Sequence, residues 1–232
     1  MKNNYEESLF ILECAVLNIQ ENASNMDYSP EAIDRLKNAY DDMQELVKRV
    51  TLNDAGFNCV SLADSDKPRV FFDMDGTLSV WEDNPIEEVA KAGYFYARQP
   101  QESVVGALKA LAESEECEVY ILSSTFIDDH SVSEKVAWNA LYTKLPRARQ
   151  LYVPYGMDKD EFLMECGGIK KTDILVDDFS YNLHRWKGVG IKVLNGVNGT
   201  KGTWHGPMIR YTDPVDEIVK TIVQVAKAAR EA

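Results

Sequence analysis

Two aspartates one residue apart, Asp73 and Asp75, directly follow an apolar run at residues 70–72. Such a run is typical of a buried parallel strand, and alternation along an extended chain places both carboxylates on one side. Two like charges at a strand end are costly unless a positive group lies between them. We therefore expect a divalent metal ion. Mg²⁺ fits best, because it takes one or two carboxylates together with substrate phosphate.

A second acidic pair, Asp177 and Asp178, follows another apolar run at residues 174–176. An Asp-Asp helix cap would explain one of these acids, but it would not explain why the chain carries two acidic pairs in the same setting. A shared Mg²⁺ ion accounts for both pairs at once.

The segment Asp73-Met74-Asp75-Gly76-Thr77-Leu78 resembles the first motif of the haloacid dehalogenase (HAD) superfamily of phosphotransferases, which reads DxDG[TV][LV]. The resemblance implies a Mg²⁺-dependent phosphomonoesterase that works through an aspartyl-phosphate intermediate. Asp73 would attack phosphorus, and Asp75 would protonate the leaving oxygen and later deprotonate water. The metal ion would be held by Asp73, the main-chain carbonyl of Asp75, and Asp178, with Asp177 as outer support and Asn182 at the last motif position.

The two middle motifs of this superfamily supply a hydroxyl and a lysine, and both have candidates here. Ser123 ends an apolar run, where the resemblance assigns a hydrogen bond to a phosphoryl oxygen, and Ser124 would add its backbone N–H. Lys159, at the head of a predicted helix, would neutralise charge on the phosphoryl group and the nucleophile. Lys170 and Lys171 are rivals, but they precede a predicted strand and so face away from the site.

Within this superfamily, residues 69–182 are most similar to the 5′(3′)-deoxyribonucleotidases, through DMDGTLSVW, GYFYARQPQESVVGALKAL, VYILSST, SEKVAW, MDK and ILVDD. The resemblance implies a nucleotide or another small phosphomonoester as substrate, with Trp81 packing on the base and Lys135 as a second phosphate contact. Two departures weaken the transfer of nucleotide selectivity. Met157 stands where the group has an arginine, and the cap between the first two motifs is much shorter here.

A cap reduced to about residues 80–96 would leave the site open. A phosphatase that acts on a nucleic-acid end or a phosphoprotein is therefore an alternative, as is a non-catalytic binding protein on the same scaffold. The intact pair of Asp73 and Asp75 argues against a scaffold, which would have no need of the second acid.

Composition narrows the range of partners. The 232 residues carry 38 acidic against 25 basic side chains, for a formal net charge of −13. This balance argues against duplex nucleic acid, because such binding relies on many Lys and Arg contacts to phosphates. A small phosphorylated substrate, held by a metal ion and a few local cations, is compatible with it. The apolar content of 45% suffices for one sizeable core and an appendage.

The chain has four cysteines, which are Cys14, Cys59, Cys117 and Cys166. They lie far apart without C-x-x-C spacing, which disfavours a zinc site or a disulfide framework and favours a reducing, cytoplasmic setting. The N-terminus lacks a basic region, and Glu13 interrupts the apolar run at residues 9–17. We therefore expect neither a signal peptide nor a membrane span.

Alternating strands and helices must bring the polar groups together. From residue 69 onward, apolar runs predict strands at 70–73, 118–122, 150–153, 174–177 and 191–194. Helical patterns occur near 102–113, 131–145, 159–166 and 214–229. This alternation predicts a three-layer, Rossmann-like α/β fold with a parallel sheet covered on both faces. Ligands of such sheets bind beyond the carboxyl ends of the strands, where each polar motif falls.

Residues 1–65 carry two apolar patterns with spacings of three and four, and Ser29-Pro30 offers a helix start between them. They predict an N-terminal helical hairpin, followed by the catalytic domain at residues 66–232. Three roles for the hairpin are open: a lid over the site, a homodimer interface, or a structural extension. The short linker at residues 63–68 favours docking on its own catalytic domain.

The glycine-rich segment 195–206 follows the last predicted strand and lacks a phosphate-loop pattern. It is either a loop that covers the substrate with Trp204 or a plain connection.

Overall fold

The structure is a computed structural model that describes residues 34, 35, 38, 62, 65–114, 116–128, 130–198 and 203–231. The chain divides into two units, residues 1–55 and 56–232. In the first unit Asp34, Arg35 and Asn38 are helical and exposed. Most of the hairpin predicted at residues 1–65 lies outside the described residues, so its roles as a lid or a dimer interface stay predictions.

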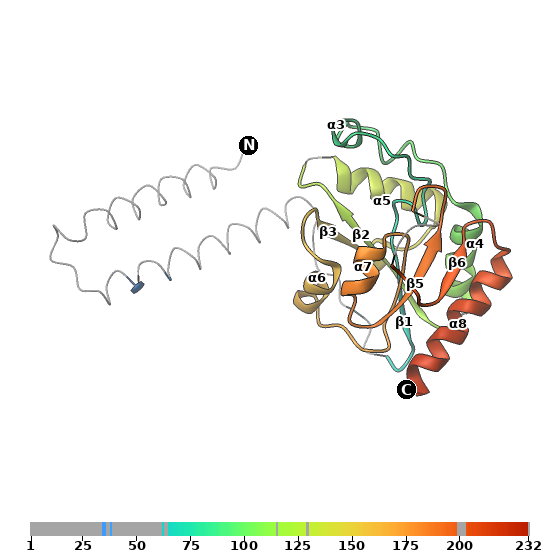
Figure 1. The fold of residues 1–232 in the computed structure, drawn as a ribbon. Coiled ribbons are helices and arrows are strands. Elements are labelled where there is room, and N and C mark those ends of the chain that lie inside the picture. The colour runs from blue at the N-terminus through green and yellow to red at the C-terminus, as the bar shows by residue number, and fades with distance from the viewer. Residues whose placement is uncertain are drawn as a thin grey trace, which may run out of the picture. The chain divides into compact units, whose positions relative to one another are not determined.

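A six-stranded parallel sheet forms the centre of the second unit, in the order β3-β2-β1-β4-β5-β6 (Figure 1). The strands are β1 (Arg69–Phe72), β2 (Glu118–Thr125), β3 (Gln150–Pro154), β4 (Ile174–Asp177), β5 (Val189–Leu194) and β6 (Met208–Arg210). β1, β3 and β4 are buried along their whole length, as strands covered on both faces must be. The predicted Rossmann-like parallel α/β fold is confirmed.

Helices lie on both faces of the sheet (Figure 1). They are α3 (Ile86–Val89), α4 (Glu102–Ser114), α5 (Ser131–Tyr142), the 3-10 turn η1 (Arg147–Arg149), α6 (Lys159–Glu165), α7 (Ser180–Arg185) and α8 (Val215–Glu231). The connection through α4 leads from β1 to β2 and that through α7 leads from β4 to β5, in opposite directions along the sheet. Right-handed crossovers therefore place these helices on opposite faces. α8 packs against α4, and α6 shares one buried cluster with α7.

One predicted helix is shorter in the structure, and several short elements of the structure were not predicted. The helix predicted at residues 131–145 ends earlier, because Thr143 caps it and Lys144 takes a left-handed φ of 58°. The short helices α3 and α7, the 3-10 turn η1 and the edge strand β6 were not predicted. In β6 only Ile209 is buried, so its three residues leave almost no apolar pattern in the sequence.

Between β1 and α4 the chain makes an excursion away from the sheet, and the two ends of this segment are hydrogen-bonded to each other. The N–H of Val80 donates to the carbonyl of Gln99 at 2.8 Å, and that of Gln101 donates to the carbonyl of Leu78 at 2.7 Å. The segment 80–99, where the short cap is expected, thus starts and ends side by side. Three of its side chains, Val89, Tyr94 and Phe95, form a small buried cluster. Trp81 and Phe126, the residue after β2, pack against it.

Two of the four cysteines, Cys117 and Cys166, differ in their chemical state. Cys166 is disulfide-bonded, which corrects the expectation of reduced thiols throughout and removes part of the support for a reducing compartment. Cys117 is a free thiol, and burial raises its pKa to about 11.

Among the described helices, none combines the length and apolar character needed to cross a membrane.

Candidate active site

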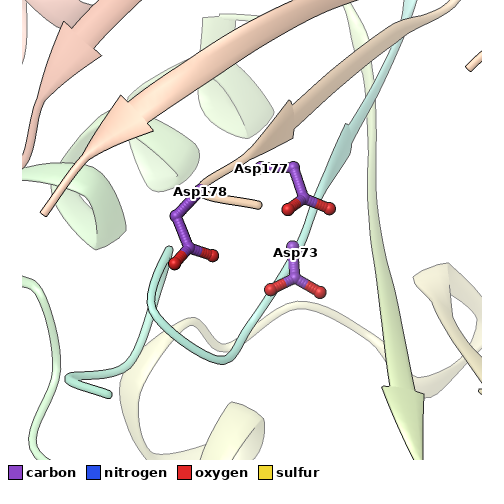
Figure 2. Close-up of side chains that lie close together, drawn as sticks. All are labelled: Asp73, Asp177 and Asp178. Carbon is purple, nitrogen blue, oxygen red and sulfur yellow. The ribbon is translucent and has the colours of Figure 1, made fainter. Parts of the chain in front are cut away.

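Three buried carboxylates meet where β1 and β4 end. Asp73 directly follows β1, Asp177 is the last residue of β4, and Asp178 comes next. The two strands are paired neighbours, and the N–H of Asp73 donates to the carbonyl of Val176 at 2.9 Å. One oxygen from each carboxylate lies within 4.8 Å of the others (Figure 2). The parallel sheet thereby brings together acids that are about a hundred residues apart in the sequence.

Lys159 joins this group from α6, of which it is the first residue. Its buried ammonium donates to Asp73 Oδ1 and to Asp177 Oδ2, each at 2.6 Å. Burial lowers the pKa of Lys159, but attraction to Asp177 and Asp73 more than offsets this and holds the pKa above its usual value. The rival Lys170 is exposed, and its ammonium lies 3.5 Å from the carbonyl of Ser65.

The acidic cluster carries more negative charge than Lys159 neutralises. Burial raises the pKa of Asp73 to about 8, with neighbouring carboxylates adding to the rise and Lys159 opposing it. Burial and the charge of Asp177 raise the pKa of Asp178 to about 7. A divalent cation with a preference for oxygen ligands would relieve this repulsion. The residues present therefore fit a Mg²⁺ site.

The hydrogen bonds of Asp177 suit it to a supporting place. Its Oδ2 accepts from Lys159 and, at 2.9 Å, from the amide of Asn182, while its Oδ1 accepts from the N–H of Phe179 at 2.8 Å. Both oxygens are thus occupied by the protein. By contrast, among the described residues only Lys159 donates a hydrogen bond to the carboxylate of Asp73.

Two asparagines that sequence reasoning missed orient Asp178. Asn195 and Asn198 donate their side-chain amides to Asp178 Oδ2 at 2.7 and 2.6 Å, and the amide of Asn195 also reaches the carbonyl of Gly76 at 2.8 Å. Asn195 directly follows β5. Its place at the carboxyl edge of the sheet, like that of the aspartates, was the signal that could have identified it.

Gly76 is required for both its backbone conformation and its lack of a side chain. Its φ is +86°, and a Cβ would lie 2.3 Å from Asp178 Oδ2. Gly76→Ala is expected to reduce the free energy of unfolding by about 1–3 kcal/mol through backbone strain alone. The displacement of Asp178 by the added Cβ should increase this loss. Gly167→Ala is the matched control, since its φ is +113° and a Cβ there meets nothing within 4 Å. If Gly76→Ala and Gly167→Ala lose equal free energy of unfolding in urea, the close contact between Gly76 and Asp178 does not contribute to stability.

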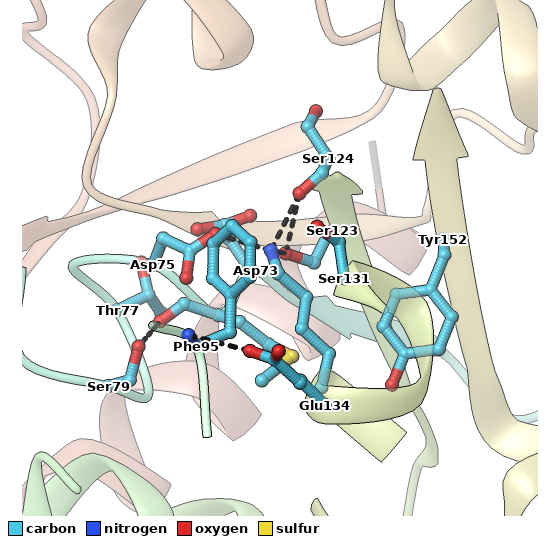
Figure 3. Close-up of polar contacts among 12 residues, drawn as sticks. Asp73, Asp75, Thr77, Ser79, Phe95, Ser123, Ser124, Ser131, Glu134 and Tyr152 are labelled. Atoms are coloured by element: carbon cyan, nitrogen blue, oxygen red, sulfur yellow. Dashed lines mark hydrogen bonds and ion pairs between the residues drawn. The ribbon is translucent and has the colours of Figure 1, made fainter. Parts of the chain in front are cut away.

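A second polar group lies beside the first (Figure 3). Asp75 forms an ion pair with the ammonium of Lys135. The same ammonium donates to Ser123 Oγ at 2.9 Å and to the carbonyl of Ser124 at 2.6 Å. The predicted site residues thus divide into one cluster around Lys159 and another around Lys135.

A pocket of about 550 Å³ opens over both clusters. From the sheet edge it is lined by Asp73, Asp75, Ser124, Asp177 and Asp178. Its outer wall combines apolar and aromatic residues with polar ones and a glycine. The first kind are Trp81, Tyr155, Met157, Phe179, Tyr181 and Val197, and the others are Asp83, Gly156, Asp158, Asn182 and Asn198. Of these aromatic residues the sequence singled out only Trp81. Tyr155 and Phe179 follow strand ends, which was the available signal.

Trp204 does not belong to the residues that line this pocket. Its indole packs on His184, with ring centroids 5.5 Å apart, and would meet a Cβ added at Gly190 or Gly206. The proposed cover of the substrate by Trp204 is therefore wrong for the described part of segment 195–206. Asn198 and Val197 from the start of that segment do line the pocket.

Fourteen chains of solved structures match part of this chain, and two of them illustrate the likeness. A protein from Mesorhizobium loti, named as a candidate HAD-like phosphatase, is 14% identical over 73% of this chain and 92% of its own, with a TM-score of 0.48. DsGPDH of Dunaliella salina is 15% identical over 66% of this chain and 30% of its own, with a TM-score of 0.40. No protein-family model matches the chain, and no curated protein matches it.

Proposed function

We propose that the chain is a Mg²⁺-dependent phosphomonoesterase of the HAD type, with Asp73 as the nucleophile. The observation that carries the proposal is the buried contact of Lys159 with Asp73 inside an acidic cluster that faces the pocket. A carboxylate needs a nearby cation to approach an anionic phosphoryl group, and this arrangement supplies one.

The reaction divides hydrolysis into two displacements at phosphorus. A carboxylate oxygen of Asp73 attacks, the bond from phosphorus to the leaving oxygen breaks, and Asp75 gives that oxygen its proton. Asp75 then takes a proton from water, whose oxygen attacks the aspartyl phosphate. The bond between Asp73 and phosphorus breaks, and inorganic phosphate leaves. Ser123, the backbone N–H of Ser124 and Lys159 would hold the phosphoryl oxygens.

Asp73, Asp178 and the main-chain carbonyl of Asp75 would hold Mg²⁺, with Asp177 in support. When bound, the ion supplies positive charge that balances the phosphoryl oxygens. The raised pKa values of Asp73 and Asp178 support this assignment, because they mark buried carboxylates whose negative charge is poorly solvated and would be stabilised by a bound cation.

Chelation tests the metal requirement. Exhaustive EDTA treatment is expected to abolish hydrolysis of p-nitrophenyl phosphate, and Mg²⁺ is expected to restore it. Asp178→Ala should raise the Mg²⁺ concentration needed for half-maximal activity by at least about 100-fold, since even outer-shell changes cost 10–100-fold in affinity. The Mg²⁺-dependent rise in melting temperature should also disappear. Asp216→Ala, which removes an exposed acid on α8, is the control. Undiminished activity after chelation would exclude this site.

A nucleotide or another small phosphomonoester is the proposed substrate, and Trp81 at the pocket wall supports it by offering a flat face for a ring. A larger substrate, such as a nucleic-acid end or a phosphoprotein, is the second candidate. It is favoured by the exposure of Tyr155, Phe179 and Tyr181, which are 63%, 51% and 52% accessible at the pocket mouth. A screen of nucleotides, sugar phosphates, phosphopeptides and 5′-phosphorylated oligonucleotides with Mg²⁺ separates the two.

A further inference from the structure

Lys135 was expected to contact phosphate, but its surroundings differ from those of a phosphate-binding lysine. It lies in the second turn of α5 with a fully buried side chain. Its ammonium is bound to Asp75, to the hydroxyl of Ser123 and to the carbonyl of Ser124 (Figure 3). A lysine ammonium has three hydrogens to donate, so these three contacts use them all.

Access from the pocket is also closed. The ring of Phe95 lies over the ammonium of Lys135, with Nζ 4.4 Å from the ring centroid. Asp75 and Ser124 line the pocket, whereas Lys135, like Lys159, is not among its lining residues. A phosphoryl group would have to displace one of the three acceptors to reach Nζ. Lys159 differs, because it donates to two carboxylates and has a third hydrogen with no further partner among the described residues.

The ion pair fixes the place of the Asp75 carboxylate. Asp73, Asp177 and Asp178 form the group of acids that could share a metal ion, and Asp75 is outside that group. Lys135 binds the Asp75 carboxylate through Oδ2, and the carboxylate remains 20% accessible at the pocket. A carboxylate that moves protons at the leaving oxygen must stay off the metal and face the substrate. Lys135 holds Asp75 in that arrangement.

The residue next to Lys135 secures the segment above it. The carboxylate of Glu134 accepts hydrogen bonds from the backbone N–H groups of Gly93 at 2.5 Å, Phe95 at 3.1 Å and Tyr96 at 3.5 Å. Figure 3 shows the contact with Phe95. These bonds anchor the segment 80–99 to α5. They hold the Phe95 ring over the ammonium, where it excludes water and strengthens the ion pair.

We propose that Lys135 is a positioning residue: it holds the Asp75 carboxylate on the pocket side for proton transfer, and Glu134 and Phe95 keep it in place. This inference rests on the proposed phosphatase function. In this assignment Lys135 positions Asp75, which protonates the leaving group, whereas Lys159 contacts the nucleophile Asp73.

Leaving-group dependence tests the proposal on the full-length protein with Mg²⁺. Phenyl phosphate needs a proton on its leaving oxygen, and 2,4-dinitrophenyl phosphate does not. Lys135→Met is expected to lower kcat/KM for phenyl phosphate by about 100-fold or more, the scale of general acid catalysis, and that for the dinitrophenyl ester by about threefold at most. The inhibition constant of inorganic phosphate should stay within about twofold of wild type, because no donor to phosphate is lost.

A double-mutant cycle shows whether Lys135 acts through Asp75. In an Asp75→Asn background, Lys135→Met should change kcat/KM for phenyl phosphate by less than about threefold, because two residues that act as one unit are strongly non-additive. A further loss of about 100-fold in that background would overturn the proposal.

A buried lysine is a risk to folding, so Glu134→Gln provides a second test that keeps Lys135. It should lower kcat/KM for phenyl phosphate about 5–10-fold and leave the dinitrophenyl ester nearly unchanged, because a neutral amide accepts backbone N–H bonds less strongly. Equal losses for both esters in either variant, or weaker inhibition by inorganic phosphate in Lys135→Met, would overturn the positioning role. Wild-type protein that hydrolyses neither ester would instead overturn the proposed function.

Discussion

Asp73→Asn is expected to lower kcat by a factor of about 10⁵ or more, the scale on which loss of a catalytic nucleophile acts. The amide cannot form the aspartyl phosphate, and no carboxylate nearby can take its place. Asp177 accepts hydrogen bonds through both oxygens, and Asp178 is held by Asn195 and Asn198. The variant should keep its fold, since Lys159 retains Asp177 as a partner and a buried carboxylate with a raised pKa is removed.

Asp75→Asn is the matched comparison, because it removes the second acid of the same motif. It should still accumulate phosphoenzyme from an activated ester, since attack by Asp73 then needs no proton donor, while the second step stalls. Acid quenching with a ³²P-labelled aryl phosphate measures the trapped protein. Near-normal turnover of p-nitrophenyl phosphate by Asp73→Asn, or absence of label from Asp75→Asn, would show that the assigned roles are wrong.

Lys159→Met is expected to have the next largest effect, on activity and stability together. Loss of one preorganised cation at the reacting group should lower kcat/KM by about 10²–10³. Asp73 and Asp177 would both lose a buried partner, and breaking a buried ion pair costs about 3–5 kcal/mol of unfolding free energy. Mg²⁺ should recover part of this stability, because it replaces the lost positive charge.

Lys170→Met is the control for this effect. Lys170 is the rival lysine at the opposite end of β4, and its side chain is exposed. Its replacement should change the unfolding free energy by less than about 0.5 kcal/mol and leave kcat/KM unaltered. Urea unfolding with and without Mg²⁺, together with steady-state kinetics, measures both variants. If the two variants have similar unfolding free energies and similar kcat/KM, the role assigned to Lys159 is wrong.

The sequence by itself determined the features that depend on near neighbours. Buried parallel strands must be continuous apolar runs, so β1 and β4 and the acids at their ends could be read directly from the chain. The rule that connections cross over right-handed then fixed the layered fold. The two acidic pairs, which a shared cation would explain, predicted that Asp73 and Asp178 meet, and the pairing of β1 with β4 brings them together.

Only the tertiary structure decided which polar groups touch the acids. Lys135 reaches Asp75 across 60 residues, Lys159 reaches Asp73 across 86, and Asn195 reaches Gly76 across 119. The sequence assigned both lysines to phosphate, because a lysine near a motif looks the same whether its hydrogens are free or already used. The direction and saturation of a hydrogen bond depend on where every acceptor lies in space, and local patterns do not record that.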